Sequence, residues 1–140
     1  MVFIEGMTFT VNWLLHNNGD CPVLDHLESL GSSNPSFQAS AIDVLKKLRE
    51  GKYHKMPYTK SLEGKIAKGI LEGRVMGRSS NQLARYPFIY LPNRQVVLLY
   101  GFTKKEGKAP PKFVEKAKLY KELIENGGLK YEEIDFTIFQ

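Results

Sequence analysis

The sequence predicts a small α+β domain that combines a mostly antiparallel sheet, an N-terminal helical hairpin and a C-terminal helix. The chain has 140 residues, 42% apolar and 25% charged, which is an ordinary balance for one globular domain. Short segments with alternating or continuous apolar residues are typical of strands, and three longer segments repeat apolar residues at helical spacing. The predicted order is β-α-α-β-β-β-α followed by a tail, which is typical of helices packed on an antiparallel sheet.

The first part of the chain contains the first strand and the helical hairpin. Apolar residues alternate along residues 7–15, which predicts a strand. Pro22 and Pro35 each open a helix, because proline is tolerated in the first helical turn. Gly31 and Gly51 follow the last apolar residues of these helices, so we expect each helix to end there.

The second part of the chain contains three strands and the last helix. Residues 70–78 alternate apolar and polar side chains, which predicts a strand, and residues 82–91 are expected to form the neighbouring strand. Residues 96–103 are apolar on both faces, which is typical of a strand in the middle of a sheet. The last helix is predicted from Pro110 to about Gly127.

The remaining segments are less regular. We expect residues 52–68 to form an exposed basic loop, because Pro57 and Gly64 interrupt any period. Pro87 predicts a bulge or an edge position, since proline cannot donate a ladder hydrogen bond. Apolar residues alternate again in 131–140, which predicts an edge strand or a dimer contact.

The charge of the chain is strongly uneven. The net charge is +5, but residues 46–112 hold sixteen Lys or Arg and four Asp or Glu, a net charge of +12. The rest of the chain carries −7. We therefore expect the middle of the chain to form a surface that faces a polyanion.

Several classes of protein are excluded by composition and motifs. No stretch is long and apolar enough for a membrane helix, and the N-terminus lacks the pattern of a secretory signal. Cys21 is the single cysteine and cannot form an internal disulfide. His16, His26 and His54 lack metal-ligand spacing, and no nucleotide-binding loop is present. The sequence predicts a cytoplasmic protein without a metal or cofactor.

Basic residues at strand positions are the first candidates for a binding site. They come from the two neighbouring strands and from the end of the next one: Arg74, Arg78, Arg85, Lys104 and Lys105. Cations that converge on a rigid sheet bind phosphates by charge and by bidentate hydrogen bonds. The alternative is a solvated outer sheet face on which acidic residues such as Glu72 pair with the arginines.

Aromatic and titratable side chains near these cations are the second candidates. Tyr86 and Tyr100 are the best placed to stack on unpaired bases, although aromatic residues in strands are more often part of a core. His54 titrates near neutral pH and is a candidate acid or base, with an ordinary exposed histidine as the alternative. Cys21 precedes a helix start, but a buried or capping role is favoured over a reactive thiol.

Two segments resemble a known family. Residues 69–75 (Gly-Ile-Leu-Glu-Gly-Arg-Val) are followed by Arg85, and residues 97–105 (Val-Leu-Leu-Tyr-Gly-Phe-Thr-Lys-Lys) are followed by Lys108 and Pro110. This pattern resembles the phage-derived HigB-like branch of the RelE/ParE toxin superfamily, with its motifs G-L-x-E-L-R and L-L-H-G-F-x-K-K-x-x-K-x-P. The resemblance covers residues 10–126 and implies a single RelE-like domain over 1–140, with residues 127–140 as a C-terminal extension.

The resemblance implies the toxin of a type II toxin–antitoxin pair, commonly an mRNA interferase, an endoribonuclease that cleaves messenger RNA in the ribosome without a metal. Its partners would be messenger RNA, the ribosome and a helix-turn-helix or similarly acidic antitoxin, and a homo-oligomer is compatible with it. By matching positions, Arg74 and Arg85 would stabilise the phosphate. The implied catalytic set is completed by Lys104 and Tyr100, and the implied RNA-binding set is Arg78, Lys105, Lys108, Lys60 and Tyr86.

Two departures from the family pattern leave alternatives open. Tyr100 stands where the branch usually has histidine, so the acid–base role would fall to a phenol whose ordinary pKa is about 10, or the ring would stack instead. Gly73 replaces a core leucine, which predicts a looser or bulged strand. The alternatives are a ParE-like toxin that binds DNA gyrase, and a family member that binds RNA or a partner without catalysis.

Overall fold

Three α-helices and a seven-stranded sheet make up residues 7–62, 64–77, 82–105 and 107–140, the part of the chain that the computed structural model describes. The elements in chain order are β1 (Thr10–Leu15), α1 (Pro22–Ser33), α2 (Pro35–Arg49), β2 (Thr59–Ser61), η1 (Lys65–Ala67), β3 (Leu71–Met76), β4 (Gln82–Leu91), β5 (Gln95–Leu98), β6 (Phe102–Lys105), α3 (Pro111–Glu125), β7 (Lys130–Glu133) and η2 (Phe136–Phe139).

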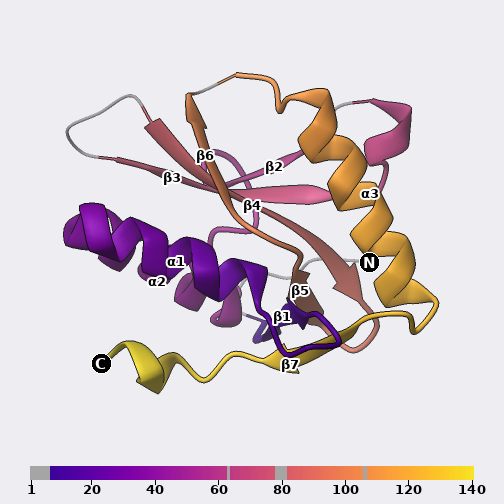
Figure 1. Ribbon diagram of the computed structural model, residues 1–140, viewed down its shortest axis with the longest axis horizontal. Helices are drawn as coiled ribbons and strands as arrows, with labels where there is room; N and C mark the ends of the chain where they lie inside the picture. Colours follow the sequence, from indigo (N-terminus) through magenta and orange to yellow (C-terminus); the bar gives the residue numbers. More distant parts are fainter. Residues whose placement is uncertain (1–6, 63, 78–81, 106) are drawn as a thin grey trace.

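The sheet is mixed and mostly antiparallel. Its strand order is β2-β3-β4-β5-β1-β7, and β6 pairs with β4 beside this path. β1 and β5 are parallel, whereas the other pairs are antiparallel. The helical hairpin of α1 and α2 lies on one side of the sheet and α3 on the other (Figure 1). The predicted α+β class and the predicted helical hairpin are therefore confirmed.

Each face of the sheet packs against its own apolar core. Leu27, Leu45 and Leu48 of the hairpin pack against Tyr86 and Phe88 of β4, among other buried residues. On the opposite face, Ala117 and Ile124 of α3 pack against Ile89, Val97 and Tyr100. Burial of large apolar side chains on both faces supplies most of the stabilisation of such a layered fold.

Two predicted boundaries differ from the structure in the first half of the chain. α1 continues past Gly31 to Ser33, and a Cβ at Gly31 would lie 2.3 Å from Nε2 of Gln38 in α2. This glycine therefore permits close approach of the two helices rather than ending the first. The predicted loop 52–68 contains β2 and η1, because residues 59–61 pair with β3.

The predicted strand 96–103 is divided into β5 and β6. The chain leaves β5 at Leu99, whose N–H donates to the carbonyl of Pro87 at 2.8 Å, and continues as β6 beside the other half of β4. Pro87 lies where β4 changes its neighbour from β5 to β6, which explains a proline inside a central strand. β3 pairs without interruption through Gly73, so the predicted loosening is not observed.

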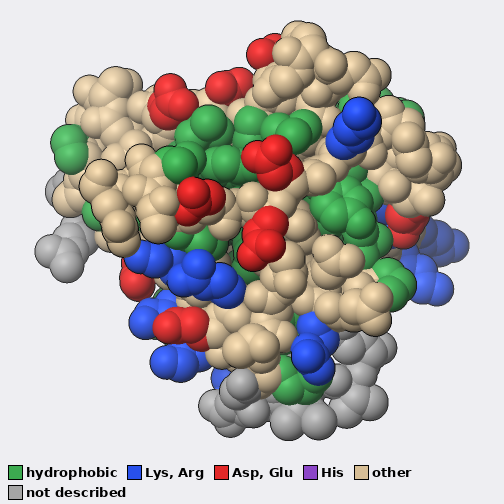
Figure 2. Space-filling view, turned by 90° about the horizontal axis from the view of Figure 1, so that it is seen from below, with side chains coloured by type: hydrophobic (Ala, Val, Ile, Leu, Met, Phe, Trp, Pro, Cys, Tyr) green, Lys and Arg blue, Asp and Glu red, His purple; other side chains and the backbone are tan. Residues whose placement is uncertain are grey.

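The C-terminal segment is part of the sheet. β7 pairs with β1 at the edge opposite to β2, and Ile134 and Phe136 are buried in the core beneath the hairpin. Figure 2 shows the face on which β7 lies, where acidic side chains gather beside exposed apolar ones. An edge strand is present in the predicted tail, but it comprises Lys130–Glu133, and the alternating apolar residues that predicted it follow the strand and lead into η2. No helix in the described ranges has the length and apolar character to cross a membrane.

Candidate nucleic-acid interface

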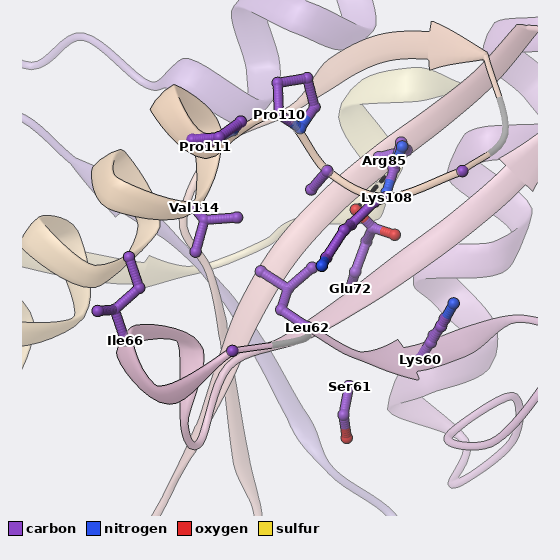
Figure 3. A pocket seen from close by; sticks show the side chains of 13 residues that line it. Lys60, Ser61, Leu62, Ile66, Glu72, Arg85, Lys108, Pro110, Pro111 and Val114 are labelled. Atoms are coloured by element: carbon purple, nitrogen blue, oxygen red, sulfur yellow. Dashed lines mark hydrogen bonds and ion pairs between the residues drawn. The ribbon is translucent and has the colours of Figure 1, made fainter.

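A cleft of about 410 Å³ lies between the start of α3, the segment around β2 and η1, and strands β3 and β4. One side of the cleft is apolar and the other is polar (Figure 3). The apolar lining comprises Leu62, Ile66, Ala109, Pro110, Pro111 and Val114, and the polar lining comprises Lys60, Ser61, Glu72, Arg85 and Lys108. A concave site with an apolar wall and a few convergent polar groups is the usual form of a ligand site.

The register of β3 and β4 brings the strand charges to the same face. Arg74 pairs directly with Arg85, and Glu72 lies two residues before Arg74. Paired residues and residues two apart point to the same face of a sheet. All three side chains therefore lie on the face that α3 covers, next to the cleft.

The three side chains form a buried charged cluster. Arg85 Nε donates to Glu72 Oε1 at 2.7 Å, and Arg74 Nε lies 3.4 Å from Glu72 Oε2. The exposed fractions are 8% for Arg74, 1% for Glu72 and 2% for Arg85. Charges at such depth persist only when they are paired, so Glu72 holds both guanidinium groups in place. The guanidinium carbon of Arg85 also lies 5.3 Å from the centroid of the Phe102 ring, a cation–π contact.

The structure brings three of the predicted cations into one cleft. Lys60 is half-buried, Lys108 is exposed, and both line the cleft together with Arg85. Lys104 is exposed on β6 and pairs with Leu83, outside the cleft lining but two residues along from Phe102, on the same face of the sheet.

Two predicted RNA-binding residues have side chains that the structure does not describe. Lys105 pairs with Gln82 through the backbone, and its side chain is outside the described part. Arg78 lies outside the described residues altogether.

Tyr100 differs from its predicted catalytic or stacking role. Its side chain is 1% exposed, and its hydroxyl donates to the backbone carbonyl of Phe113 in the first turn of α3. Burial raises the pKa of Tyr100 well above its ordinary value of 10.0, with a further contribution from the charge of Glu72. The group therefore attaches the strand end to α3, and its proton is not available near neutral pH.

Tyr86 also differs from its predicted role as a stacking residue. The side chain is fully buried on the face of the helical hairpin, and its hydroxyl lies 2.9 Å from His26 Nδ1. His26 Nε2 in turn lies 2.8 Å from Thr103 Oγ1. Burial lowers the pKa of His26 to about 4 and raises that of Tyr86, so both groups are neutral at pH 7. They form a neutral hydrogen-bonded network between α1 and β6.

The two other candidates from the sequence, His54 and Cys21, have structural rather than chemical roles. Both nitrogens of His54 are engaged, with Nε2 donating to the carbonyl of Leu48 at 2.8 Å and Nδ1 at 2.7 Å from the Tyr90 hydroxyl. Burial lowers the pKa of His54, which keeps the ring neutral. Burial also raises the pKa of Cys21 to about 11, so this thiol is unreactive. Among the described side chains, no three His, Cys, Asp or Glu residues gather as a metal site requires.

Sequence reasoning missed two parts of the site. The sequence pattern predicts Glu72 only as a surface partner, whereas it is buried and organises both arginines; its position in the motif before Arg74 is the signal that could have identified it. The apolar wall from η1 and α3 had no signal in the sequence, because Ile66 and Val114 are far apart along the chain and meet only in the fold.

A family model described as phage derived protein Gp49-like (DUF891) matches residues 28–122, which is more than half of the chain. The matched range contains all the residues that line the cleft. No curated protein matches the chain.

Proposed function

Since the chain belongs to the phage-derived Gp49-like family, which is a RelE/toxin-like family, we propose that it is the toxin of a toxin–antitoxin pair and cleaves messenger RNA bound to the ribosome. We further propose that it belongs to the HigB-like branch. An antitoxin of the helix-turn-helix or similarly acidic type would neutralise it by covering its basic side.

The observation that supports this proposal is the two-sided cleft. A nucleotide combines a flat apolar base with an anionic phosphate, and the cleft places an apolar wall opposite Lys60, Arg85 and Lys108. Sequence-independent contacts with RNA are made largely by cations on phosphates and by apolar or aromatic surfaces on bases. The volume of about 410 Å³ lies within the range of small-ligand sites.

The proposed reaction is an internal transfer at phosphorus. A base removes the proton of a 2′-hydroxyl, the oxygen attacks the adjacent phosphorus, and the bond from phosphorus to the 5′-oxygen breaks as an acid protonates that oxygen. Negative charge increases on the phosphate oxygens in the transition state, where Lys60, Lys108 and Arg85 would stabilise it. Glu72 would act by positioning Arg85, to which it is bonded at 2.7 Å. This reaction requires no metal or cofactor.

A second candidate function is binding of RNA or a partner without cleavage. It is favoured by the surroundings of Tyr100, whose hydroxyl is held by Phe113, and by the 2% exposure of Arg85. In such a protein the cleft would retain a nucleotide, and neither acid nor base would be required.

Induced expression in a bacterial host, followed by mapping of transcript ends, tests the proposal. We expect growth arrest with new transcript ends, and we expect Lys60→Ala together with Lys108→Ala to relieve both. Lys118→Ala on the outer surface of α3, where Lys118 pairs with Glu122 at 3.9 Å, is the control and should leave both unchanged. Arrest with intact transcripts and DNA damage would instead indicate a gyrase-binding toxin. A chain that causes no arrest but binds RNA would indicate the second candidate.

A further inference from the structure

A pair of stacked tyrosines lies just before β2, outside the cleft. The rings of Tyr53 and Tyr58 are 3.7 Å apart between centroids and inclined by 15°, which is a face-to-face stack. Tyr58 is 36% exposed, and the neighbouring Met56 is 59% exposed. We call Tyr53 and Tyr58 the tyrosine platform. Large apolar side chains exposed together on a surface indicate a binding site more often than scattered ones do.

The backbone holds the tyrosine platform rigidly. The Thr59 hydroxyl donates to the carbonyl of Tyr53 at 2.6 Å, and the Arg74 N–H donates to the carbonyl of Tyr58 at 2.7 Å. Tyr53 adopts a φ of 65°, a left-handed conformation that is unfavourable for a side chain of this size. Such strain persists only where the surroundings impose it and is most common at functional positions. The two rings are thus preorganised, which reduces the entropy lost on binding.

The charges around the tyrosine platform favour an anionic ligand. Both rings border a hollow of about 520 Å³ whose described lining contains Lys52 and Lys55 and no acidic side chain. Both lysines are exposed. The rings also border a second hollow, beside α2 and β3, whose lining contains one acidic side chain, Asp43, and one basic one, Arg74. The first hollow therefore combines an aromatic surface with two cations.

The tyrosine platform and the cleft are close along the chain. Tyr58 immediately precedes β2, and Lys60 is the middle residue of that strand. Lys60 lines the cleft, whereas Tyr58 belongs to the platform. A strand of RNA that leaves the cleft past Lys60 would therefore reach the tyrosine rings.

We propose that the tyrosine platform binds an unpaired base of single-stranded RNA, while Lys52 and Lys55 contact the neighbouring phosphates. This inference rests on the proposed function for the identity of the ligand. It extends the interface from the cleft to a second position on the same strand. Base stacking on aromatic rings next to cations is the general mode by which proteins bind single strands without reading their sequence.

The test is a binding titration followed by fluorescence anisotropy at several salt concentrations. The probe is a labelled 2′-O-methyl uridylate dodecamer, which has no 2′-hydroxyl to react; its duplex with oligoadenylate is the comparison. We expect Tyr58→Leu to weaken binding of the single strand by about 5- to 150-fold, the range for one lost base stack, with an unchanged salt dependence. Tyr58→Trp should restore binding, and the duplex should bind equally to all three proteins.

Lysine variants separate the charge contribution from stacking. Lys55→Gln should weaken binding and reduce the slope of log affinity against log salt by about 0.7, the value for one phosphate of a single strand. Lys108→Gln measures the contribution of the cleft to RNA binding, separately from that of the tyrosine platform. If Lys108→Gln weakens binding but Tyr58→Leu leaves it unchanged, the platform inference is wrong and the proposed function stands. If Tyr58→Leu abolishes binding of an acidic peptide and leaves RNA binding unchanged, the platform binds a protein partner and the inference is also overturned. If the wild-type protein does not bind the single strand, the platform inference is wrong, whereas the proposed function is decided by transcript-end mapping.

Discussion

The two faces of β4 differ in how they accommodate polar groups. On the face of the helical hairpin, Tyr86 is buried and its hydroxyl is satisfied by His26, so every partner in this network is neutral. On the face of α3, Arg85 is equally buried but is charged and is held by Glu72. Adjacent residues of one strand therefore serve opposite purposes: one completes a core, and the other supplies charge to a cleft.

This difference shows where function can be placed on a small fold. Neutral hydrogen bonds allow a face to close completely, because no charge has to be removed from water. A buried ion pair contributes little net stability but keeps a charge in a defined position. The α3 face thus holds charge at the cleft, and the hairpin face supplies most of the packing.

The largest expected effect comes from removing the charge that holds the α3 face together. Glu72→Gln leaves Arg74 and Arg85 without the carboxylate that both contact, and removal of one partner from a buried ion pair lowers the free energy of unfolding by about 3–5 kcal/mol. Urea denaturation of the wild type and the variant measures this loss in the free energy of unfolding. The control is Glu122→Gln, an exposed partner of Lys118, for which we expect less than about 1 kcal/mol. Equal effects of the two variants would show that the faces do not differ in this way.

The next effect tests the packing of the hairpin face. A Cβ at Gly101 would lie 2.6 Å from a Tyr86 ring carbon and 2.8 Å from the His26 ring, so Gly101→Ala should lower the free energy of unfolding by about 2–3 kcal/mol. At Gly73 a Cβ would make only ordinary contacts, the nearest at 3.8 Å. We expect Gly73→Ala to leave stability unchanged or raise it by about 0.5–1 kcal/mol. A tolerated Gly101→Ala would contradict the tight contact seen here.

The third effect is a pH dependence that belongs to the hairpin face. The folded chain lowers the pKa of His26 from 6.5 to about 4, so between these values the unfolded chain binds the additional proton. The free energy of unfolding therefore falls as pH decreases from about 6.5 to 4, on the order of 2 kcal/mol after allowance for partial exposure. Thermal melts of the wild type and His26→Gln over this range measure the contribution. Parallel curves for the two proteins would be evidence against a neutral buried histidine.

The smallest effect concerns Tyr100 on the α3 face. Tyr100→Phe removes the hydroxyl that donates to Phe113, and the loss of one hydrogen bond lowers the free energy of unfolding by about 1 kcal/mol. If the chain cleaves transcripts as proposed, cleavage should persist in this variant, because the phenol hydroxyl is bonded to Phe113. A melting curve checks the expected loss of stability, and transcript-end mapping checks the cleavage. Abolished cleavage in a stable variant would restore the acid–base role that the sequence resemblance implies.

Much of the fold was predictable because local patterns carry it. Pro22 and Pro35 indicated the starts of both hairpin helices, and alternation indicated β1 and β3. β2 was missed because three residues are too few to show a period, and its partner strand defines it. The division of 96–103 was missed because its apolar run is continuous, whereas the change of neighbour at Pro87 is a property of the whole sheet.

The site was predictable in its cations but not in its surroundings. Lys60, Arg85 and Lys108 were all singled out, and the fold places them around one cleft. Tyr86 and Tyr100 were selected for their position beside cations in the sequence, but side chains alternate between faces, so sequence neighbours are not neighbours in space. Tyr53 and Tyr58 were not selected, because the turn that stacks them gives no periodic signal.

The sequence by itself determined the class of the fold and the concentration of positive charge in residues 46–112, because periodicity, capping residues and composition are local properties. Only the tertiary structure decided which polar groups are buried, and with which partners. The physical reason is that a strand pattern specifies two faces without specifying what covers them. Here the hairpin covers Tyr86 and α3 borders Arg85, and that difference separates a core residue from a member of the cleft.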